Sequence, residues 1–162
     1  MRRPFSVQVF LVTRAEPEPS VLLLQRNARP DLDLADFWQG VSGAVEDHES
    51  FEQAAVREVM EETGVAIDNV AASGFEHWFP IKPEWRASYG PEPTAVHERV
   101  FYAQIPKASR PKLSSEHKAW QWAPLSQALR LLSFGRNAEC LLSVSNHLSV
   151  VGPPGFEAGN GC

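Results

Sequence analysis

Apolar and polar positions alternate over several short stretches of the chain, and this pattern predicts β-strands. Residues 5–13 alternate and are rich in β-branched and aromatic side chains, which is typical of a strand. Residues 21–25 form a continuous apolar run, which predicts a strand buried on both faces. Further strands are expected at residues 65–78, with an irregularity at Ser73 and Gly74, and at residues 97–105 and 118–122.

Helices are expected in the middle and near the end of the chain. Pro124 is suited to begin a helix that runs to about Leu132, and another helix is expected from Arg136 to about Leu148. The loops are expected at residues 27–36, 80–93 and 106–115. Strands on both sides of a central helix, followed by helices, predict an α+β fold, an α/β/α sandwich with a mixed sheet between helices.

The central helix has start and stop signals at both ends. Ser50 and Gln53 match a capping box, and Gly64 can take the left-handed conformation that ends a helix. The positions that share the apolar side of this helix are Val56, Val59, Met60 and Thr63. We expect that side to pack on the core and the opposite, acidic side to face a cleft.

The acidic side carries Glu58, Glu61 and Glu62 at i, i+3 and i+4, so a helix places three carboxylates on one face. Like charges at this spacing repel, and a divalent cation offsets the repulsion. Hard oxygen ligands suit Mg²⁺ or Mn²⁺. The competing interpretation is a solvated acidic helix with exposed i,i+4 pairs, which explains neither the flanking glycines nor Arg57. An EF-hand loop fits less well, because its alternating Asp/Asn ligands are missing.

The segment that contains this helix, residues 43–65, reads GAVEDHESFEQAAVREVMEETGV and resembles the Nudix box in every motif position. The resemblance implies the Nudix fold and hydrolysis of a pyrophosphate bond in a nucleoside-triphosphate-like substrate. It also implies Mg²⁺ as the cofactor, with Mn²⁺ as a substitute.

The resemblance also implies roles for single residues. It assigns metal binding to Glu58, Glu62, Glu61, Glu116 and the backbone carbonyl of Gly43. Arg57 would orient the glutamates, and Glu49 would have a structural part. The base that takes the proton from the attacking water is either Glu61 or Glu116, and the sequence does not rank them.

Short segments outside the box are similar to bacterial dihydroneopterin triphosphate diphosphatases. They are residues 3–4, 21–26, 36–39, 115–117 and 133–137. This resemblance implies that dihydroneopterin triphosphate is cleaved to the monophosphate and pyrophosphate. The chain departs from these enzymes in the loops at residues 27–35 and 80–93, which could bear on substrate choice.

Substrate-binding residues follow from the same resemblance. Arg26 and Arg2 would meet the phosphates, Ser42 would form a hydrogen bond nearby, and Trp38 would stack on the heterocycle. Arg26 at a strand end is equally well explained as a surface charge or as a phosphate clamp. The histidines at 97 and 117 are expected to be structural or exposed rather than ligands.

The bulk composition limits the classes of function. The 162 residues suit one domain at 1–150, with a Gly/Pro-rich tail at 151–162 that we expect to be disordered. The formal net charge of −5 and the lack of a basic run argue against nucleic-acid and anionic-membrane partners. Two distant cysteines give no disulfide framework, and no stretch is long enough to span a membrane, so a cytoplasmic location is expected. The expected partner is a small-molecule polyphosphate, with the chain as a monomer or homodimer.

Three functions remain open from the sequence. The first is hydrolysis of dihydroneopterin triphosphate. The second is the same chemistry on a nucleoside triphosphate, an ADP-sugar or a dinucleoside polyphosphate. The third is a non-catalytic module that senses a nucleotide, although a pure binding module has no need of the full glutamate set.

Overall fold

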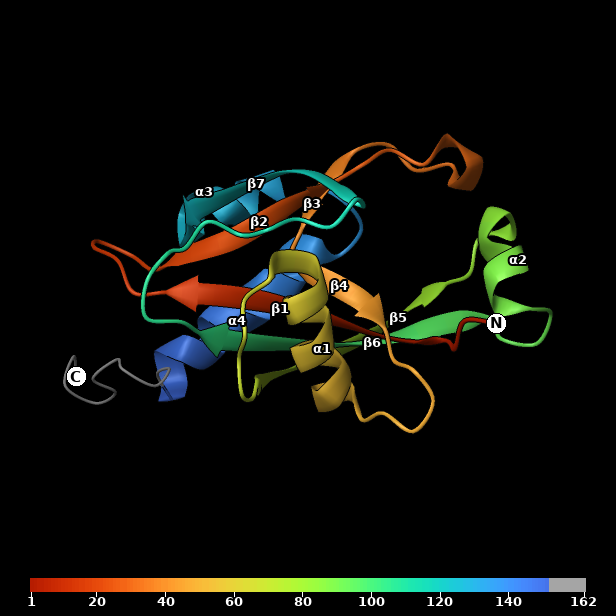
Figure 1. Ribbon diagram of the computed structural model, residues 1–162, viewed down its shortest axis with the longest axis horizontal. Helices are drawn as coiled ribbons and strands as arrows, with labels where there is room; N and C mark the ends of the chain where they lie inside the picture. The colour runs from red at the N-terminus through yellow and green to blue at the C-terminus, as the bar shows by residue number, and fades with distance from the viewer. Residues whose placement is uncertain (152–162) are drawn as a thin grey trace.

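Across the residues that the computed structural model describes, 1–151, seven strands form one mixed sheet with helices on both faces (Figure 1). The predicted disordered tail lies outside the described residues, apart from Val151, which ends the last helix. The strands are β1 (Phe5–Thr13), β2 (Ser20–Arg26), β3 (Phe37–Gln39), β4 (Val41–Ala44), β5 (Ala71–Pro80), β6 (Ala95–Gln104) and β7 (His117–Pro124). The α-helices are α1 (Phe51–Thr63), α2 (Arg86–Tyr89), α3 (Leu125–Leu131) and α4 (Asn137–Val151), with 3₁₀ turns η1 (Pro30–Leu32) and η2 (Pro83–Trp85).

The strand order is β3-β2-β1-β6-β5, with β4 paired to β1 and β7 paired to β2. The β1–β6 pair is parallel and the other pairs are antiparallel. One edge of β1 pairs with β2 at residues 12–13 and with β4 at residues 6–9. β3 therefore extends the sheet beside β2, and the next strand, β4, pairs with β1 instead. This change of partner lies next to α1, the helix that carries the three glutamates.

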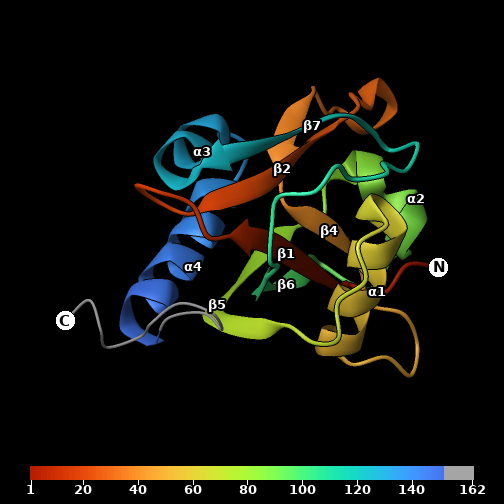
Figure 2. The same cartoon turned by 60° about the vertical axis from the view of Figure 1, so that its left-hand side comes forward.

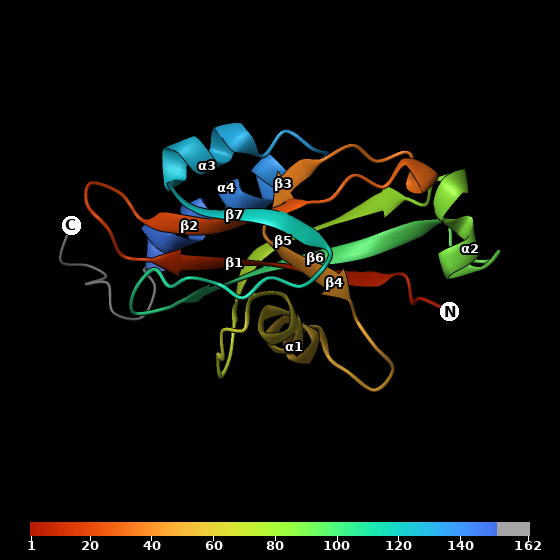
Figure 3. The ribbon, with the colours of Figure 1, turned by 45° about the horizontal axis from the view of Figure 1, so that its top comes forward.

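Alternation along β1 sends its side chains into two different apolar layers. Val7, Val9 and Leu11 lie in the cluster under α1, whereas Phe10 and Val12 lie in the cluster under α3 and α4. Figures 2 and 3 show α1 on one side of the sheet and α4 on the other. The predicted α/β/α sandwich is confirmed. None of the helices described here is both long and apolar enough to cross a membrane.

The boundaries of α1 agree with the capping signals. The Ser50 hydroxyl accepts a hydrogen bond from the Gln53 backbone N–H at 3.0 Å, and the Gln53 side chain accepts one from the Ser50 N–H at 2.8 Å. Gly64 follows with φ of +74°, the left-handed value that favours glycine. The sequence therefore placed both ends of this helix correctly.

The predicted orientation of α1 was wrong in part. Met60 is 47% exposed, and the buried stripe includes the glutamates at 58 and 62. Ala54 and Ala55 are fully buried, so the helix can approach the sheet closely along this side. The helix is therefore rotated so that two of the three carboxylates point inward.

One strand prediction and two loop predictions also need correction. The strand expected at residues 65–78 begins later than predicted. β5 starts at Ala71, and residues 65–70 contain no strand. The predicted irregularity is present, as a register shift between Ala72 and Glu76 around Gly74, which has φ of +85°. The expected loops at 27–36 and 80–93 contain short helical turns, η1 in the first and η2 with α2 in the second.

Candidate active site

Gly43 of β4 lies directly against the carboxylate of Glu58. A Cβ atom on residue 43 would stand 2.1 Å from Cδ of Glu58, so this approach requires a glycine. On the neighbouring strand, the Ser6 hydroxyl donates a hydrogen bond to the Gly43 carbonyl at 3.0 Å. The strand and the helix thus bring a backbone carbonyl and a carboxylate together.

Arg57 connects the acidic residues on both sides of it. Its guanidinium donates to both oxygens of Glu49, at 2.7 and 2.9 Å. The Nη1 group donates to Glu58 at 2.8 Å and to Glu61 at 3.1 Å. Nη2 also donates to the carbonyl of Ala44 at 2.9 Å, which ties α1 to β4. These contacts fix the directions of the carboxylates.

Glu62 is buried and has partners from the loop that precedes β7. Its Oε2 accepts a hydrogen bond from the Ser114 hydroxyl at 2.8 Å and lies 2.9 Å from Nδ1 of His117. The side chain of Glu116, which is exposed, also interacts with Glu62. The sequence analysis expected His117 to be structural or exposed; it is buried and belongs to the glutamate cluster.

Burial and pairing shift the pKa values of this cluster in different directions. Burial raises the pKa of Glu58 to about 7, against the opposing effect of Arg57 and with a further rise from Glu61 and Glu62. For Glu62, burial also acts upward, but the contacts with His117 and Ser114 leave its pKa below the usual range. The hydrogen bond to Glu49 is the largest cause of the raised pKa of Arg57.

The donor set fits a hard divalent cation. The atoms that could hold it are the carboxylates of Glu58, Glu62, Glu61 and Glu116 and the carbonyl of Gly43. Burial disfavours the charged form of Glu58 and raises its pKa despite the contact with Arg57, and a bound cation would favour the charged form. All of these atoms are oxygens, which suits Mg²⁺ or Mn²⁺ better than softer metals.

A cavity of about 410 Å³ is lined by Ser42, the neighbour of Gly43, and by none of the glutamates of the cluster. Arg2, Arg26 and Ser42, which the sequence analysis assigned to substrate binding, line this cavity. Trp38 does not, because alternation along β3 turns it into the apolar cluster under α3 and α4. Phe37 faces the cavity instead and stacks on Phe134, with ring centroids 4.0 Å apart and an interplanar angle of 15°.

Two loops that are distant in the sequence meet over the cavity. The indole N–H of Trp85 donates to the carbonyl of Leu32 at 3.1 Å, which joins η2 to η1. Both residues line the cavity, as does Tyr89 of α2. The two segments lie at the same end of the molecule (Figure 1). Residues from the two predicted loops at 27–36 and 80–93 therefore lie together at the cavity.

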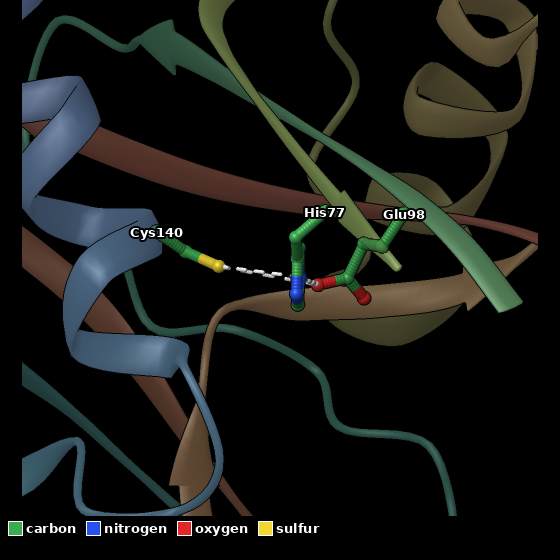
Figure 4. A group of neighbouring side chains, drawn as sticks. All are labelled: His77, Glu98 and Cys140. Atoms are coloured by element: carbon green, nitrogen blue, oxygen red, sulfur yellow. Dashed lines mark hydrogen bonds and ion pairs between the residues drawn. The ribbon is translucent and has the colours of Figure 1, made fainter. Parts of the chain in front are cut away.

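The floor of the cavity is polar, and sequence reasoning missed it. Gln8 donates from Nε2 to Glu98 and to Asn137, both at 3.2 Å. His77 lies 2.8 Å from Glu98, and Cys140 of α4 approaches His77 at 3.7 Å (Figure 4). The available signal was Gln8 within the apolar run of β1, whereas Glu98 stands between His97 and Arg99 and gave no such signal.

One chain of contacts links the cavity to the glutamate cluster. Gln39 lines the cavity, and its Nε2 lies 3.2 Å from Nε2 of His117. The other ring nitrogen of His117 contacts Glu62. The cavity and the carboxylates are therefore connected through Gln39 and His117, although no glutamate of the cluster lines the cavity.

A model of the NUDIX domain matches residues 2–142, so the chain belongs to the Nudix family and is a pyrophosphohydrolase of that family. Enzymes of this family generally use a divalent metal and act on small nucleotide-like substrates.

Three comparisons point to one group within the family. The chain is 38% identical over 136 residues to dihydroneopterin triphosphate diphosphatase of Escherichia coli K12, covering 79% of this chain and 84% of that protein. It is 31% identical over 137 residues to the enzyme of the same name from Haemophilus influenzae, covering 82% and 83%. The solved structure of the E. coli dihydroneopterin triphosphate pyrophosphohydrolase superposes with a TM-score of 0.72 at 30% identity, covering 86% of this chain and 93% of that one.

Proposed function

We propose that this chain is a Mg²⁺-dependent dihydroneopterin triphosphate diphosphatase that releases the monophosphate and pyrophosphate. The observation that carries the proposal is the place of β4: Gly43 lies against the carboxylate of Glu58, and the preceding residue, Ser42, lines a cavity that also holds a stacked aromatic pair. The relatives of that name, which match along most of both chains, support the same substrate.

Each part of the site has a proposed task. When bound, a divalent cation neutralises phosphate charge and lowers the pKa of a coordinated water. Glu58 and Glu62 are the principal ligands in this proposal, and Arg57 holds Glu58 and Glu61 in position. Either Glu61 or Glu116 takes the proton from the attacking water.

The cationic side chains at the cavity are proposed to bind the phosphates. Arg26 lines the cavity, and no hydrogen bond or ion pair links its guanidinium to another residue in 1–151. Arg2 lies with its guanidinium 5.6 Å from the centre of the Tyr89 ring. A guanidinium that the protein leaves unpaired in a cavity is suited to a phosphate oxygen.

A substrate panel tests this proposal. The purified protein with Mg²⁺ is assayed on dihydroneopterin triphosphate, the common nucleoside triphosphates, an ADP-sugar and a dinucleoside polyphosphate, with phosphate and pyrophosphate measured separately. We expect the highest kcat/KM for dihydroneopterin triphosphate and pyrophosphate as its product. A higher kcat/KM for another member of the panel would refute the narrow assignment.

The metal requirement is tested in the same assay. Turnover should stop in EDTA and return with excess Mg²⁺ or Mn²⁺, because the carboxylate face otherwise repels a polyphosphate. Full activity in the chelator would contradict the proposed role of the glutamates.

A further inference from the structure

Glu98 places a buried carboxylate on the cavity floor, and only one of its two oxygens accepts hydrogen bonds from the part of the protein that the structure describes. The residue is 5% exposed. Its Oε1 accepts hydrogen bonds from Gln8 at 3.2 Å and from His77 at 2.8 Å. Within 1–151, no hydrogen bond or ion pair reaches Oε2. Figure 4 shows this second oxygen turned away from Cys140.

Glu98 Oε2 is accessible from the cavity and has no donor among the described residues, so a ligand with suitably placed N–H groups can donate to it. A 2-amino-4-oxopyrimidine ring presents a ring N–H and an amino group side by side, both as donors. Pterins and guanine share this ring. Adenine presents an acceptor nitrogen beside its amino group, so it would direct a lone pair at the carboxylate.

The sheet sets the distance between Glu98 and β4, the strand whose Gly43 contacts the glutamate cluster. Glu98 is in register with Ser6, and Ser6 is in register with Ala44, the neighbour of Gly43. Two strand spacings amount to roughly 10 Å. A ring held at Glu98, on the α4 side of the sheet, would therefore lie about two strands from β4, whose Gly43 contacts Glu58 on the α1 side.

The cavity also supplies flat surfaces for a ring. Phe37 and Phe134 form a stacked pair at one wall. Trp85 and Tyr89 also line the cavity. Aromatic walls bind any planar heterocycle, so discrimination between heterocycles has to come from the polar floor.

We propose that Glu98 is the specificity-determining residue of this cavity and accepts hydrogen bonds from the amino and ring N–H groups of a 2-amino-4-oxopyrimidine ring. Gln8 and His77 are positioning residues, because they hold Oε1 and leave Oε2 to the ligand. The inference rests on the proposed function, since it names the part of the substrate that this site reads.

The test is Glu98→Gln, which keeps the shape and replaces an acceptor by an amide. GTP and ITP form a matched pair, because ITP lacks only the 2-amino group. We expect the ratio of kcat/KM for GTP to that for ITP to fall about 10- to 100-fold, mainly through KM. The ratio of dihydroneopterin triphosphate to ITP should fall in the same way. An equal loss on all three substrates would indicate a merely structural role and overturn the proposal.

Glu76→Gln is the matched control. Glu76 pairs with His97 at 2.7 Å across the same two strands, but neither residue lines the cavity. This variant should leave both ratios as in the wild type. A change as large as that of Glu98→Gln would count against a local effect at the cavity.

A metal site made by His77, Glu98 and Cys140 is the competing interpretation, because their ligand atoms lie within 4.8 Å of one another. The Gln8 amide directs its positive N–H group at the same Glu98 oxygen, which opposes a cation there. Cys140→Ala should leave the substrate ratios unchanged, and elemental analysis of the wild type should find no stoichiometric zinc. Bound zinc that disappears together with the GTP preference in Cys140→Ala would overturn the proposal.

The outcomes separate this inference from the proposed function. If dihydroneopterin triphosphate is a poor substrate while Glu98→Gln still erases the GTP preference, the substrate assignment fails and the inference holds. If dihydroneopterin triphosphate is the best substrate and Glu98→Gln does not change the kcat/KM ratios, the inference about Glu98 fails and the proposed function holds. Should the variant not fold, inhibition of the wild type decides: GMP should bind about 10-fold more tightly than IMP, and equal inhibition overturns the proposal.

Discussion

The backbone of Gly43 lies directly against the carboxylate of Glu58. In Gly43→Ala the new methyl would overlap the Glu58 carboxyl group, which is the flexible end of its side chain. We expect the fold to persist while Glu58 is displaced, with kcat/KM reduced about 100-fold. Steady-state kinetics and thermal unfolding of the same sample check both parts.

Gly40→Ala is the contrasting variant. Its Cβ would stand 2.8 Å from the backbone oxygen of Val9 and 2.9 Å from the Phe10 ring, neither of which can move freely. Here we expect a loss of about 1–3 kcal/mol in the free energy of unfolding. If Gly43→Ala destabilised the protein as much as Gly40→Ala, the displacement of Glu58 would not explain its kinetic loss.

Glu62→Gln tests the buried carboxylate. It removes the charge that Ser114 and His117 contact, so we expect a loss of about 1–3 kcal/mol in stability. We also expect turnover to fall far more than about tenfold, the loss that corresponds to about 1.4 kcal/mol of barrier. Urea titration and single-turnover kinetics measure the two effects. Turnover close to that of the wild type would show that Glu62 is not a principal ligand.

Residue spacing predicted which carboxylates share a face but not how deeply they lie. The i, i+3, i+4 pattern places Glu58, Glu61 and Glu62 together on any helix. Which of them is buried depends on what the helix packs against, and the small residues Ala54 and Ala55 draw that side inward. The polar floor residues Gln8 and Glu98 come from strands far apart in the sequence, so no local pattern connects them.

At the scale of elements, the wall made by η1 and η2 depends on one side-chain hydrogen bond. Trp85→Phe keeps an aromatic ring but removes the donor to the Leu32 carbonyl. We expect KM to rise about two- to tenfold with little change in kcat, because the wall is less well held before substrate binds. Trp78→Phe is the control, since Trp78 is 58% exposed and does not line the cavity. Equal KM values for the two variants would contradict a role for this contact.

The strands and the central helix were predictable because their signals are local. β1 follows from alternation, and α1 follows from its caps. The meeting of the two loops was not predictable, because the residues joined by the Trp85 contact are 53 positions apart and short turns carry no periodicity. The sequence also assigned the cavity contact to Trp38, whereas Phe37 makes it. Two adjacent aromatic residues in a strand do not reveal which of them lies on the cavity side.

At the scale of the whole molecule, Glu58 makes the stability of the metal-free protein depend on pH. Its folded pKa of about 7 lies above its ordinary value of 4.5, so the folded state binds more protons between these values. The contribution of Glu58 to the free energy of unfolding therefore decreases as pH rises from 5 to 7.5. We expect the difference in stability between wild type and Glu58→Gln, measured by urea unfolding in EDTA, to decrease over this range. A constant difference would contradict the raised pKa.

Added Mg²⁺ should act in the opposite direction. The cation binds the ionised carboxylate, so it stabilises the folded wild type more at pH 8 than at pH 6. At one hundred times its dissociation constant the gain is about 2.7 kcal/mol. Glu58→Gln should show a much smaller gain at either pH, and an equal gain in both proteins would place the cation elsewhere.

The parallel pairing of β1 with β6 has a consequence for how the protein is made. It joins residue 5 to residue 97 and residue 12 to residue 104, and it also brings Ser6 beside Glu98. During synthesis β1 leaves the ribosome before β6 has been made. The backbone groups along one edge of this apolar strand therefore remain unpaired for that time. Such non-local pairing slows folding and exposes the nascent chain to aggregation. The strand that carries Gln8 of the cavity floor therefore has an unpaired edge until residues 95–104 have emerged from the ribosome.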